Sequence, residues 1–323
     1  MQAVTYPRLV GDIGGTNARF GWIAAANEPL TDIDTLPGAD YATIVDAMRA
    51  YLARHGKAAP RWCAIGIANP VVGDVVKMTN HDWSFSISGV KAELGLDRFL
   101  VINDFTALAL SLPALAAADV RQVGQGVAVP GAPLALLGAG TGLGVSGLLP
   151  AGSGHGAIPL NGEGGHVTLA AIDEREERVV SILRRRFGHA SAERALSGPG
   201  IENLHQAVCE IAGETSPALT AAQITERAVA GTDVRCVDAM DLFFSFLGTI
   251  AGNLALSLGS LGGLYIGGGI VPRLGDAIDR SRFRQSFESK GRFRRYVEQI
   301  PTYVLQAKVS PGLVGAARAL DDH

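Results

Sequence analysis

The sequence has few cysteines and little charge. Its 323 residues include only three cysteines, Cys63, Cys209 and Cys236, and none forms a CxxC pair. Scattered cysteines of this kind are typical of a reducing compartment, and their spacing argues against a zinc site. Lys and Arg total 28 against 31 Asp and Glu, so the net charge is −3. Because no excess of cations is present to neutralise phosphates, we expect no nucleic-acid partner.

Long apolar runs without interruption are also scarce. The uncharged stretch between Asp241 and Arg273 is long enough to span a bilayer. Glycines interrupt it from Gly259 onward, Asn253 lies within it and no cationic flank anchors it, so a buried helix followed by a buried strand explains it better. The polar N-terminus shows no signal-peptide pattern. We therefore expect a cytoplasmic protein without membrane contact.

Glycine, by contrast, is abundant, and it concentrates in turns that follow apolar runs. The first is LVGDIGGTNARFGWI, from Leu9 to Ile23, which predicts a strand, a tight turn and a second strand. It matches neither the Rossmann fingerprint nor a Walker loop. Glycines allow backbone N–H groups to approach an oxyanion, and Thr16 adds a hydroxyl. Asp12 beside phosphates would require a cation such as Mg²⁺ between them; a structural hairpin with an exposed Asp is the alternative.

Two further turns follow the same plan. LALLGAGTGLGVSGLL, from Leu134 to Leu149, again predicts strand, glycine turn and strand, which suggests two related halves. LYIGGGIVPR, from Leu264 to Arg273, is a third apolar run that ends in glycines. The second turn lacks an acidic residue, so any role in binding a metal falls on Asp12.

The segments around these turns alternate between strand and helix patterns, and 323 residues suggest two domains. The patterns predict a hairpin over Val71–Met78 that turns at Gly73-Asp74, and a helix that starts over Ser191–Leu196 with Ser191 as N-cap. They also predict a buried helix over Asp238–Leu258. Phe283, Phe287 and Phe293 are expected to anchor their segment to the core.

Polar residues stand at the ends of several predicted elements. Asn103 and Asp104 directly follow a predicted strand, NGEGGH places Glu163 and His166 around two glycines, and Glu193 lies at a predicted helix start. A hexose offers hydroxyls that both donate and accept, so Asn, Asp, Glu and His side chains can orient it. Each residue alone also has a structural explanation. Asp104 could form a turn, Glu163 and His166 could be a local hydrogen-bonded pair, and Glu193 could be an acid that interacts with the helix dipole.

Together these segments resemble the bacterial glucokinase family of the hexokinase/actin-like ATPase superfamily. GDIGGTNARF is similar to its first phosphate motif, GAGTGLG to its second and IGGGIVPR to its adenosine motif, and the likeness runs from about Leu9 to Gly315. The cysteine-rich zinc motif typical of the related repressor/kinase group is missing. The resemblance implies an α/β, two-domain actin-like ATPase (ribonuclease H-like) fold with the active site in the interdomain cleft. It implies a small domain of residues 1–113 plus 306–323, and a large domain of residues 114–305.

The resemblance also implies ATP-dependent phosphorylation of glucose to glucose 6-phosphate by a homodimer. Asp104 would be the general base, and Asp12 would hold Mg²⁺, through water. The implied sugar-binding residues are Asn103, Asp104, Glu163, His166 and Glu193. The implied ATP-binding residues are Gly11, Asp12, Ile13, Gly14, Gly15, Thr16, Gly140, Thr141, Gly142, Gly267, Gly268 and Gly269.

Three alternatives stay open at this point. The first is a kinase for another hexose or an amino sugar, because the same residue types would serve it. A sugar-responsive transcriptional regulator would need a DNA-binding domain, and only ten residues precede Gly11. A non-kinase actin-like ATPase would have no reason to keep the sugar-site residues together.

Overall fold

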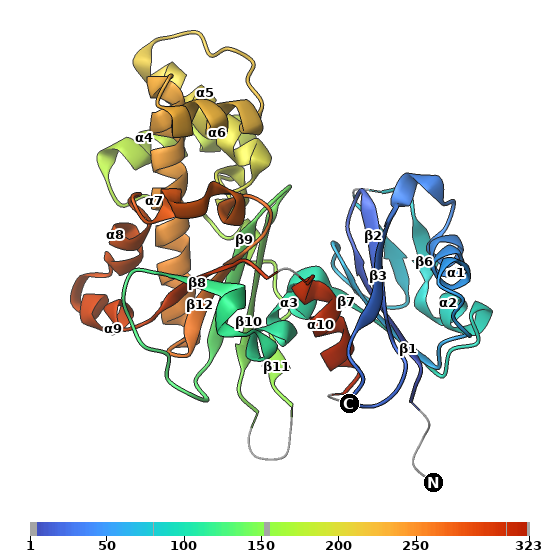
Figure 1. The fold of residues 1–323 in the computed structure, drawn as a ribbon. Helices are drawn as coiled ribbons and strands as arrows, with labels where there is room; N and C mark the ends of the chain where they lie inside the picture. The colour runs from blue at the N-terminus through green and yellow to red at the C-terminus, as the bar shows by residue number, and fades with distance from the viewer. Residues whose placement is uncertain (1–4, 80, 152–155, 308, 322–323) are drawn as a thin grey trace. The chain divides into compact units, whose positions relative to one another are not determined.

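The computed structural model describes residues 5–79, 81–151, 156–307 and 309–321, and the chain divides into two compact units. Unit 1 comprises Met1–Ala116, Ala151–Asn161 and Ala307–His323, and unit 2 comprises Ala117–Pro150 and Gly162–Gln306. Each unit contains a sheet covered by helices (Figure 1). The domains predicted from the sequence break at 113 and 305; in the structure, Ala151–Asn161 also groups with unit 1.

The sheet of unit 1 has the strand order β3-β2-β1-β4-β7. Strands β1, β4 and β7 are parallel, whereas β2 and β3 are antiparallel to their neighbours. The carboxyl ends of β1, β4 and β7 therefore meet at one edge, where ligands bind in open α/β sheets. The strands are β1 (Arg8–Ile13), β2 (Asn17–Ile23), β3 (Thr31–Pro37), β4 (Trp62–Ile67) and β7 (Arg98–Asn103).

Helices cover both faces of this sheet, with α1 and α2 on one face and α3 and α10 on the other (Figure 1). Successive strand residues accordingly enter different cores: Leu9 lies in the core beneath α1, and Val10 packs with Leu313 and Ala316 of α10. Burial on both faces explains why the strands read as continuous apolar runs. The helices are α1 (Ile44–Arg54), α2 (Ile87–Glu93), α3 (Asp104–Ser111) and α10 (Pro311–Ala319).

The sheet of unit 2 repeats this plan, with β10-β9-β12-β13-β8 in neighbouring positions. Its hairpin β9–β10 is antiparallel, and β12 and β13 continue parallel to β9, as β4 and β7 continue from β1. The two related halves suggested by the glycine turns are thus visible in the topology. The strands are β8 (Val120–Val123), β9 (Leu134–Ala139), β10 (Leu143–Leu149), β12 (Gly263–Gly267) and β13 (Thr302–Leu305).

A long central helix, α7 (Val234–Leu258), organises the core of unit 2. It begins at Val234 because the side chain of Asp233 caps it, four residues before the predicted start. Within the described residues it is the one helix long and apolar enough to cross a membrane, and 78% of its apolar window is buried inside the protein, as in a core helix. Around it lie α4 (Glu174–Phe187), α5 (Gly198–Ala212), α6 (Ala221–Ala230), α8 (Phe283–Glu288) and α9 (Arg294–Glu298).

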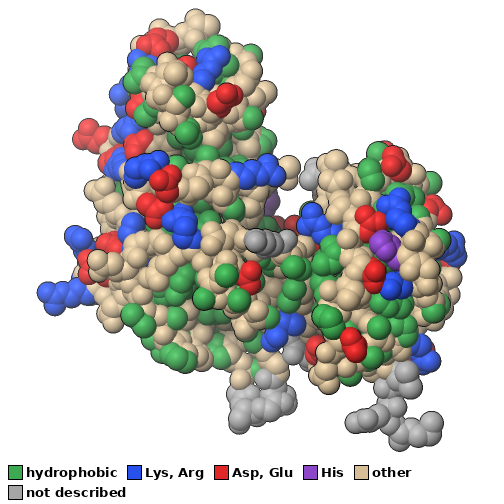
Figure 2. All heavy atoms as spheres, viewed as in Figure 1, with side chains coloured by type: hydrophobic (Ala, Val, Ile, Leu, Met, Phe, Trp, Pro, Cys, Tyr) green, Lys and Arg blue, Asp and Glu red, His purple; other side chains and the backbone are tan. Residues whose placement is uncertain are grey.

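The surface carries interspersed charges of both signs on the face drawn in Figure 2. The basic end of α4 illustrates this pattern, because Arg185 and Arg186 both pair with Glu210 of α5. These arginines serve local ion pairs, as expected for a solvated helix end.

Three local predictions are wrong. Strand β5 (Val75–Lys77) pairs with β6 (Ser84–Ser86), not across a turn at Gly73-Asp74, because the Asp74 carboxylate accepts hydrogen bonds from Ser86 and Ser88 at the start of α2. The segment after Ser191 is a single 3₁₀ turn, η5 (Ala192–Arg194), and the Ser191 side chain does not cap it. Phe283 and Phe287 are buried, but Phe293 is 47% exposed.

Candidate active site

The first glycine turn joins β1 to β2. Gly14 N–H donates to the Asn17 carbonyl oxygen at 2.9 Å, and the Thr16 carbonyl accepts from Gly38 N–H at 2.8 Å, so both ends of the turn are fastened. Thr16 is exposed at its tip. Gly11 has a different position, because it lies inside β1, where a Cβ would come within 2.8 Å of Ile65. Gly11 thus serves close packing, while Gly14 to Thr16 form the loop.

Asp12 lies near the carboxyl end of β1, half-buried. Its Oδ2 accepts a hydrogen bond from Ser310 Oγ at 2.8 Å. Gly312, in the first turn of α10, is so close that a Cβ there would be 3.0 Å from the carboxyl carbon. A carboxylate beside a helix N-terminus is favourably placed. Asp12 is therefore held by side-chain and helix contacts, unlike the exposed Asp of a purely structural hairpin.

Asn103 and Asp104 lie at the same edge of the same sheet. Asp12 of β1 lies opposite Gly66 of β4, and the next residue of β4, Ile67, lies opposite Asn103 of β7. The backbones of Asp12 and Asn103 are therefore two strand spacings apart, about 10 Å. Asn103 is the N-cap of α3, and its Oδ1 accepts from Phe105 N–H at 2.9 Å. Asp104 is the first residue of α3, so its side chain projects from the helix start.

Asn161, the first residue of NGEGGH, is fastened to α3. Its Oδ1 accepts a hydrogen bond from Thr106 Oγ1 at 2.7 Å. The segment before the two glycines is thereby tied to the helix that carries Asp104, within unit 1.

The rest of NGEGGH belongs to unit 2 and forms a 3₁₀ turn, η4 (Gly164–His166). Glu163 precedes this turn and His166 is its last residue; both are exposed, and His166 N–H donates to the Glu163 carbonyl at 3.0 Å. Gly165 packs directly on β10, where a Cβ would be 2.1 Å from the Leu143 carbonyl oxygen. The glycines of this motif therefore allow the turn to lie flat on the sheet.

Glu193 lies beside that turn. The Val167 carbonyl, next to η4, accepts from Ala192 N–H at 2.8 Å, which joins the turns that carry His166 and Glu193. Glu193 Oε2 accepts from Leu143 N–H at 2.9 Å, and a Cβ on Gly142 would be 2.5 Å from the same oxygen. The acid therefore contacts the second glycine turn directly. Unit 2 thus brings Glu163, His166 and Glu193 to one place beside Gly140–Gly142.

The second and third glycine turns end neighbouring parallel strands, β9 and β12. A Cβ on Gly138 would be 2.6 Å from the backbone of Gly267, and one on Gly268 would be 2.4 Å from the Ala139 carbonyl. Gly268 also has a φ of +77°, which favours glycine. These glycines permit backbone-to-backbone packing. Gly269 differs, since a Cβ there would meet nothing within 4 Å.

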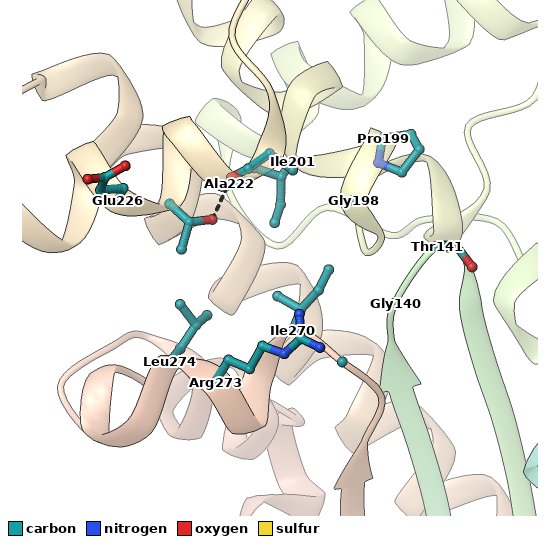
Figure 3. Close-up of a pocket in the computed structure, with 13 residues that line it drawn as sticks. Gly140, Thr141, Gly198, Pro199, Ile201, Ala222, Glu226, Ile270, Arg273 and Leu274 are labelled. Atoms are coloured by element: carbon teal, nitrogen blue, oxygen red, sulfur yellow. Dashed lines mark hydrogen bonds between the residues drawn. The ribbon is translucent and has the colours of Figure 1, made fainter. Parts of the chain in front are cut away.

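A cavity of about 690 Å³ opens beside these turns, wholly within unit 2 (Figure 3). Its volume lies in the usual range for small-molecule sites. Ile270, Arg273 and Leu274 line one side and α6 supplies residues on the other (Figure 3). The lining residues are Gly140, Thr141, Gly198, Pro199, Ile201, Ala221, Ala222, Thr225, Glu226, Gly269, Ile270, Arg273 and Leu274.

The part of this cavity formed by α5 and α6 was not predicted from the sequence. Gly198 N–H donates to the Gly140 carbonyl at 2.8 Å, so the N-terminus of α5 is tied to the second glycine turn. The signal was present as Ser197-Gly198-Pro199-Gly200, with a serine that caps Gly200 N–H at 3.0 Å and a proline in the first turn.

Comparisons with known proteins agree with this architecture. A family model described as Glucokinase matches residues 9–323. A glucokinase from Aromatoleum aromaticum is 56% identical over 319 residues, which cover 98% of this chain and 96% of the relative. The crystal structure of glucokinase from an Antarctic psychrotroph has a TM-score of 0.89 at 36% identity, covering 98% of this chain and 99% of the other.

A more distant neighbour shares the fold. It is a ROK family glucokinase from Streptomyces griseus, solved in complex with glucose and AMPPNP, with a TM-score of 0.63 at 20% identity over 97% of this chain and 99% of the other. The expected α/β actin-like ATPase fold is confirmed by these neighbours. The family model and the relative confirm the resemblance of the sequence motifs. The chain belongs to the glucokinase family.

Proposed function

We propose that this protein transfers the γ-phosphoryl group of ATP to the 6-hydroxyl of glucose, forming glucose 6-phosphate and ADP. The observation that carries this proposal is the placement of Asp12 and Asp104 two strands apart at one sheet edge. Phosphoryl transfer requires positioning, charge neutralisation and a group that accepts the proton of the nucleophile. A second carboxylate at that spacing leaves room for a phosphate and a hydroxyl between the two.

Asp104 is the proposed general base. Its carboxylate would accept a hydrogen bond from the sugar's 6-hydroxyl; as that oxygen bonds to the γ-phosphorus, the bond to the β–γ bridging oxygen breaks and the proton passes to Asp104. Asn103 caps α3, so it fixes the start of the helix whose first residue is Asp104. In this proposal Asn103, Glu163, His166 and Glu193 orient the other hydroxyls.

The nucleotide would be held by backbone groups of the glycine turns. The proposal assigns the phosphates to Gly14–Thr16 and Gly140–Gly142, and the adenosine to the cavity beside Gly269 and Arg273. Its support is the cavity volume and the helix start at Gly198, which is tied to Gly140.

Mg²⁺ fits the donor set at Asp12. Ser310 engages one carboxylate oxygen, Oδ2, so Oδ1 can accept from a water on the ion. Carboxylates and waters are the ligands that Mg²⁺ prefers, and the bound ion would neutralise phosphate charge. The sequence-based expectations of a cytoplasmic location and a homodimer remain part of the proposal.

A coupled assay for glucose 6-phosphate with Mg-ATP tests the proposal. Wild-type protein should turn over glucose, and Asp104→Asn should bind glucose, seen as a thermal shift, without turnover. Turnover of mannose or an amino sugar instead of glucose would contradict the substrate. ATP hydrolysis without phosphorylation of any sugar would contradict kinase function.

A further inference from the structure

Four residues of metal-binding types converge in unit 2, away from the glycine turns. His205 and Cys209 lie one helical turn apart on α5, and Asp233 and Cys236 lie at the start of α7. The ligand atoms of His205, Asp233 and Cys236 all lie within 4.8 Å of one another. Cys209 Sγ lies 3.8 Å from His205 Nε2. The sequence has no CxxC pair, on which the expectation of no zinc site was based, but the fold brings together H-x₃-C and D-x₂-C.

The cluster is enclosed. His205, Cys209 and Cys236 are 1%, 2% and 0% exposed, while the Asp233 side chain is 26% exposed and offers a route of entry. Burial raises the pKa of the Cys209 thiol, raises that of Cys236 to about 11 and lowers the pKa of His205. Without a metal the thiols therefore keep their protons, and the imidazole is neutral.

The geometry suits a tetrahedral ion. Zn–S bonds of about 2.3 Å and Zn–N or Zn–O bonds of about 2.0 Å place ligand atoms about 3.3–3.8 Å apart. The His205–Cys209 pair already has such a separation, and the ligand atoms of His205, Asp233 and Cys236, all within 4.8 Å of one another, would contract by up to about 1.5 Å. Cys209 would also move toward Asp233 and Cys236 to complete the set of four ligands. His205 Nδ1 lies 3.3 Å from Ser216 Oγ, which would orient the ring from the outer shell.

The other groups around the cluster are compatible with an ion. Asp233 Oδ1 caps α7 through Arg235 N–H and Cys236 N–H, and Arg227 lies 3.6 Å from Oδ2. Two thiolates, a carboxylate and a divalent cation leave one negative charge, which the arginine offsets. Thiolate and imidazole ligands select Zn²⁺ over Mg²⁺.

We propose that His205, Cys209, Asp233 and Cys236 bind one Zn²⁺ ion as a structural site. Binding replaces the two thiol protons, which are released to solvent. The ion would clamp α5 to the start of α7. Since the N-terminus of α5 borders the 690 Å³ cavity, the clamp would also fix one wall of that cavity.

Cobalt and zinc titration of the chelator-treated, full-length protein under reducing conditions tests the site. We expect one Co²⁺ per chain, with thiolate-to-cobalt charge-transfer bands and the visible bands of a tetrahedral site, both abolished by one equivalent of Zn²⁺. Zn²⁺ at a hundredfold excess over its dissociation constant should raise the melting temperature by roughly 5–10 °C. Absence of the charge-transfer bands in the wild-type protein would overturn the proposal, whatever the variants do.

Matched cysteine variants locate the ligands. Cys236→Ser and Cys209→Ser should each weaken Co²⁺ binding at least tenfold and reduce the charge-transfer intensity. Cys63→Ser removes a buried cysteine of unit 1 and should leave the titration unchanged. Equal spectra in all three variants, or a Cys209–Cys236 disulfide found by mass spectrometry in the protein as purified, would overturn the assignment.

Discussion

The two hairpins at the centre of the units share a topology but are supported differently. In unit 1, Asp12 lies in β1 just before the turn, and Ser310 and the start of α10 hold its side chain. In unit 2 the turn after β9 carries no acid, and Glu193 and the start of α5 hold it from outside. One backbone arrangement thus serves two purposes: the first turn places a carboxylate, and the second places backbone groups beside a cavity.

The largest effect is expected at the sheet edge of unit 1. Asp104→Asn should lower kcat about 10²–10⁴-fold with little change in glucose affinity, because it removes the proton acceptor but keeps the size of the side chain. Steady-state kinetics and a glucose binding titration measure this split. A loss of glucose binding equal to the loss in kcat would identify Asp104 as a sugar ligand only.

Asp12→Asn should lower kcat/KM about 10–100-fold and raise the Mg²⁺ concentration needed for half-maximal rate. Ser310→Ala leaves the carboxylate in place and should have a smaller effect of the same kind. The measurement is a Mg²⁺ titration of rate for both variants. Equal Mg²⁺ dependence of the rate in wild type and Asp12→Asn would show that Asp12 does not help to bind Mg²⁺, and the two hairpins would then not differ in this respect.

In unit 2, the adjacent residues Gly268 and Gly269 should differ in how strongly a substitution lowers stability. Gly268→Ala should destabilise the protein by about 1–3 kcal/mol, because of its positive φ and the 2.4 Å approach to Ala139. Gly269→Ala, which meets nothing within 4 Å, is the matched control and should keep wild-type stability. Denaturant unfolding gives both free energies. Similar values for the two variants would contradict the packing role of Gly268.

Arg273→Ala should raise the KM for ATP about tenfold and leave the KM for glucose unchanged, because the side chain lines the cavity of unit 2. Arg121→Ala, which removes another arginine of unit 2 that does not line this cavity, is the control. Varying each substrate separately provides the test. A change in the glucose KM alone would place the nucleotide elsewhere.

The smallest effect concerns a helix cap. The Glu176 backbone N–H and the Arg282 guanidinium hold the pKa of Asp173 below its usual value, against the effect of burial. This lowered pKa stabilises the fold at pH values above about 4, and the stabilisation is lost as pH falls through the lowered value. Asp173→Ala should therefore cost about 1 kcal/mol at pH 7 and less near pH 3. Unfolding curves at both pH values test this; a constant difference would contradict it.

The sequence predicted features that depend on neighbouring residues. The strand–turn–strand units around Gly14 and around Gly140 follow from local apolar runs and glycines. The position of Asn103 and Asp104 at a sheet edge follows from the end of the apolar run that forms β7. The contacts that support these features join distant segments: Ser310 reaches Asp12, and Gly198 reaches Gly140. No local sequence pattern shows which distant residues will be in contact, so the supporting roles of Ser310 and Gly198 were not predicted.

The wrong predictions have the same origin. Gly73-Asp74 has the composition of a hairpin turn, but the Asp74 carboxylate binds Ser86 and Ser88 instead. Glu193 was placed in a helix because Ser191 resembles an N-cap, whereas its carboxylate is directed at Leu143 N–H. In both segments a contact with a residue beyond the local window outweighs the turn or cap preference.

The fit between α3 and α10 has a consequence for how the protein is made. A Cβ on Gly315 would lie 1.6 Å from the Ala107 carbonyl, so the helix that begins with Asp104 rests on the helix that begins beside Asp12. Val10 and Ala64 also find their apolar partners on α10. A ribosome delivers these partners after nearly all of the chain, so we expect unit 2 to fold first during synthesis. The sheet edge of unit 1 that carries Asp12 and Asp104 would then be the last part to become rigid.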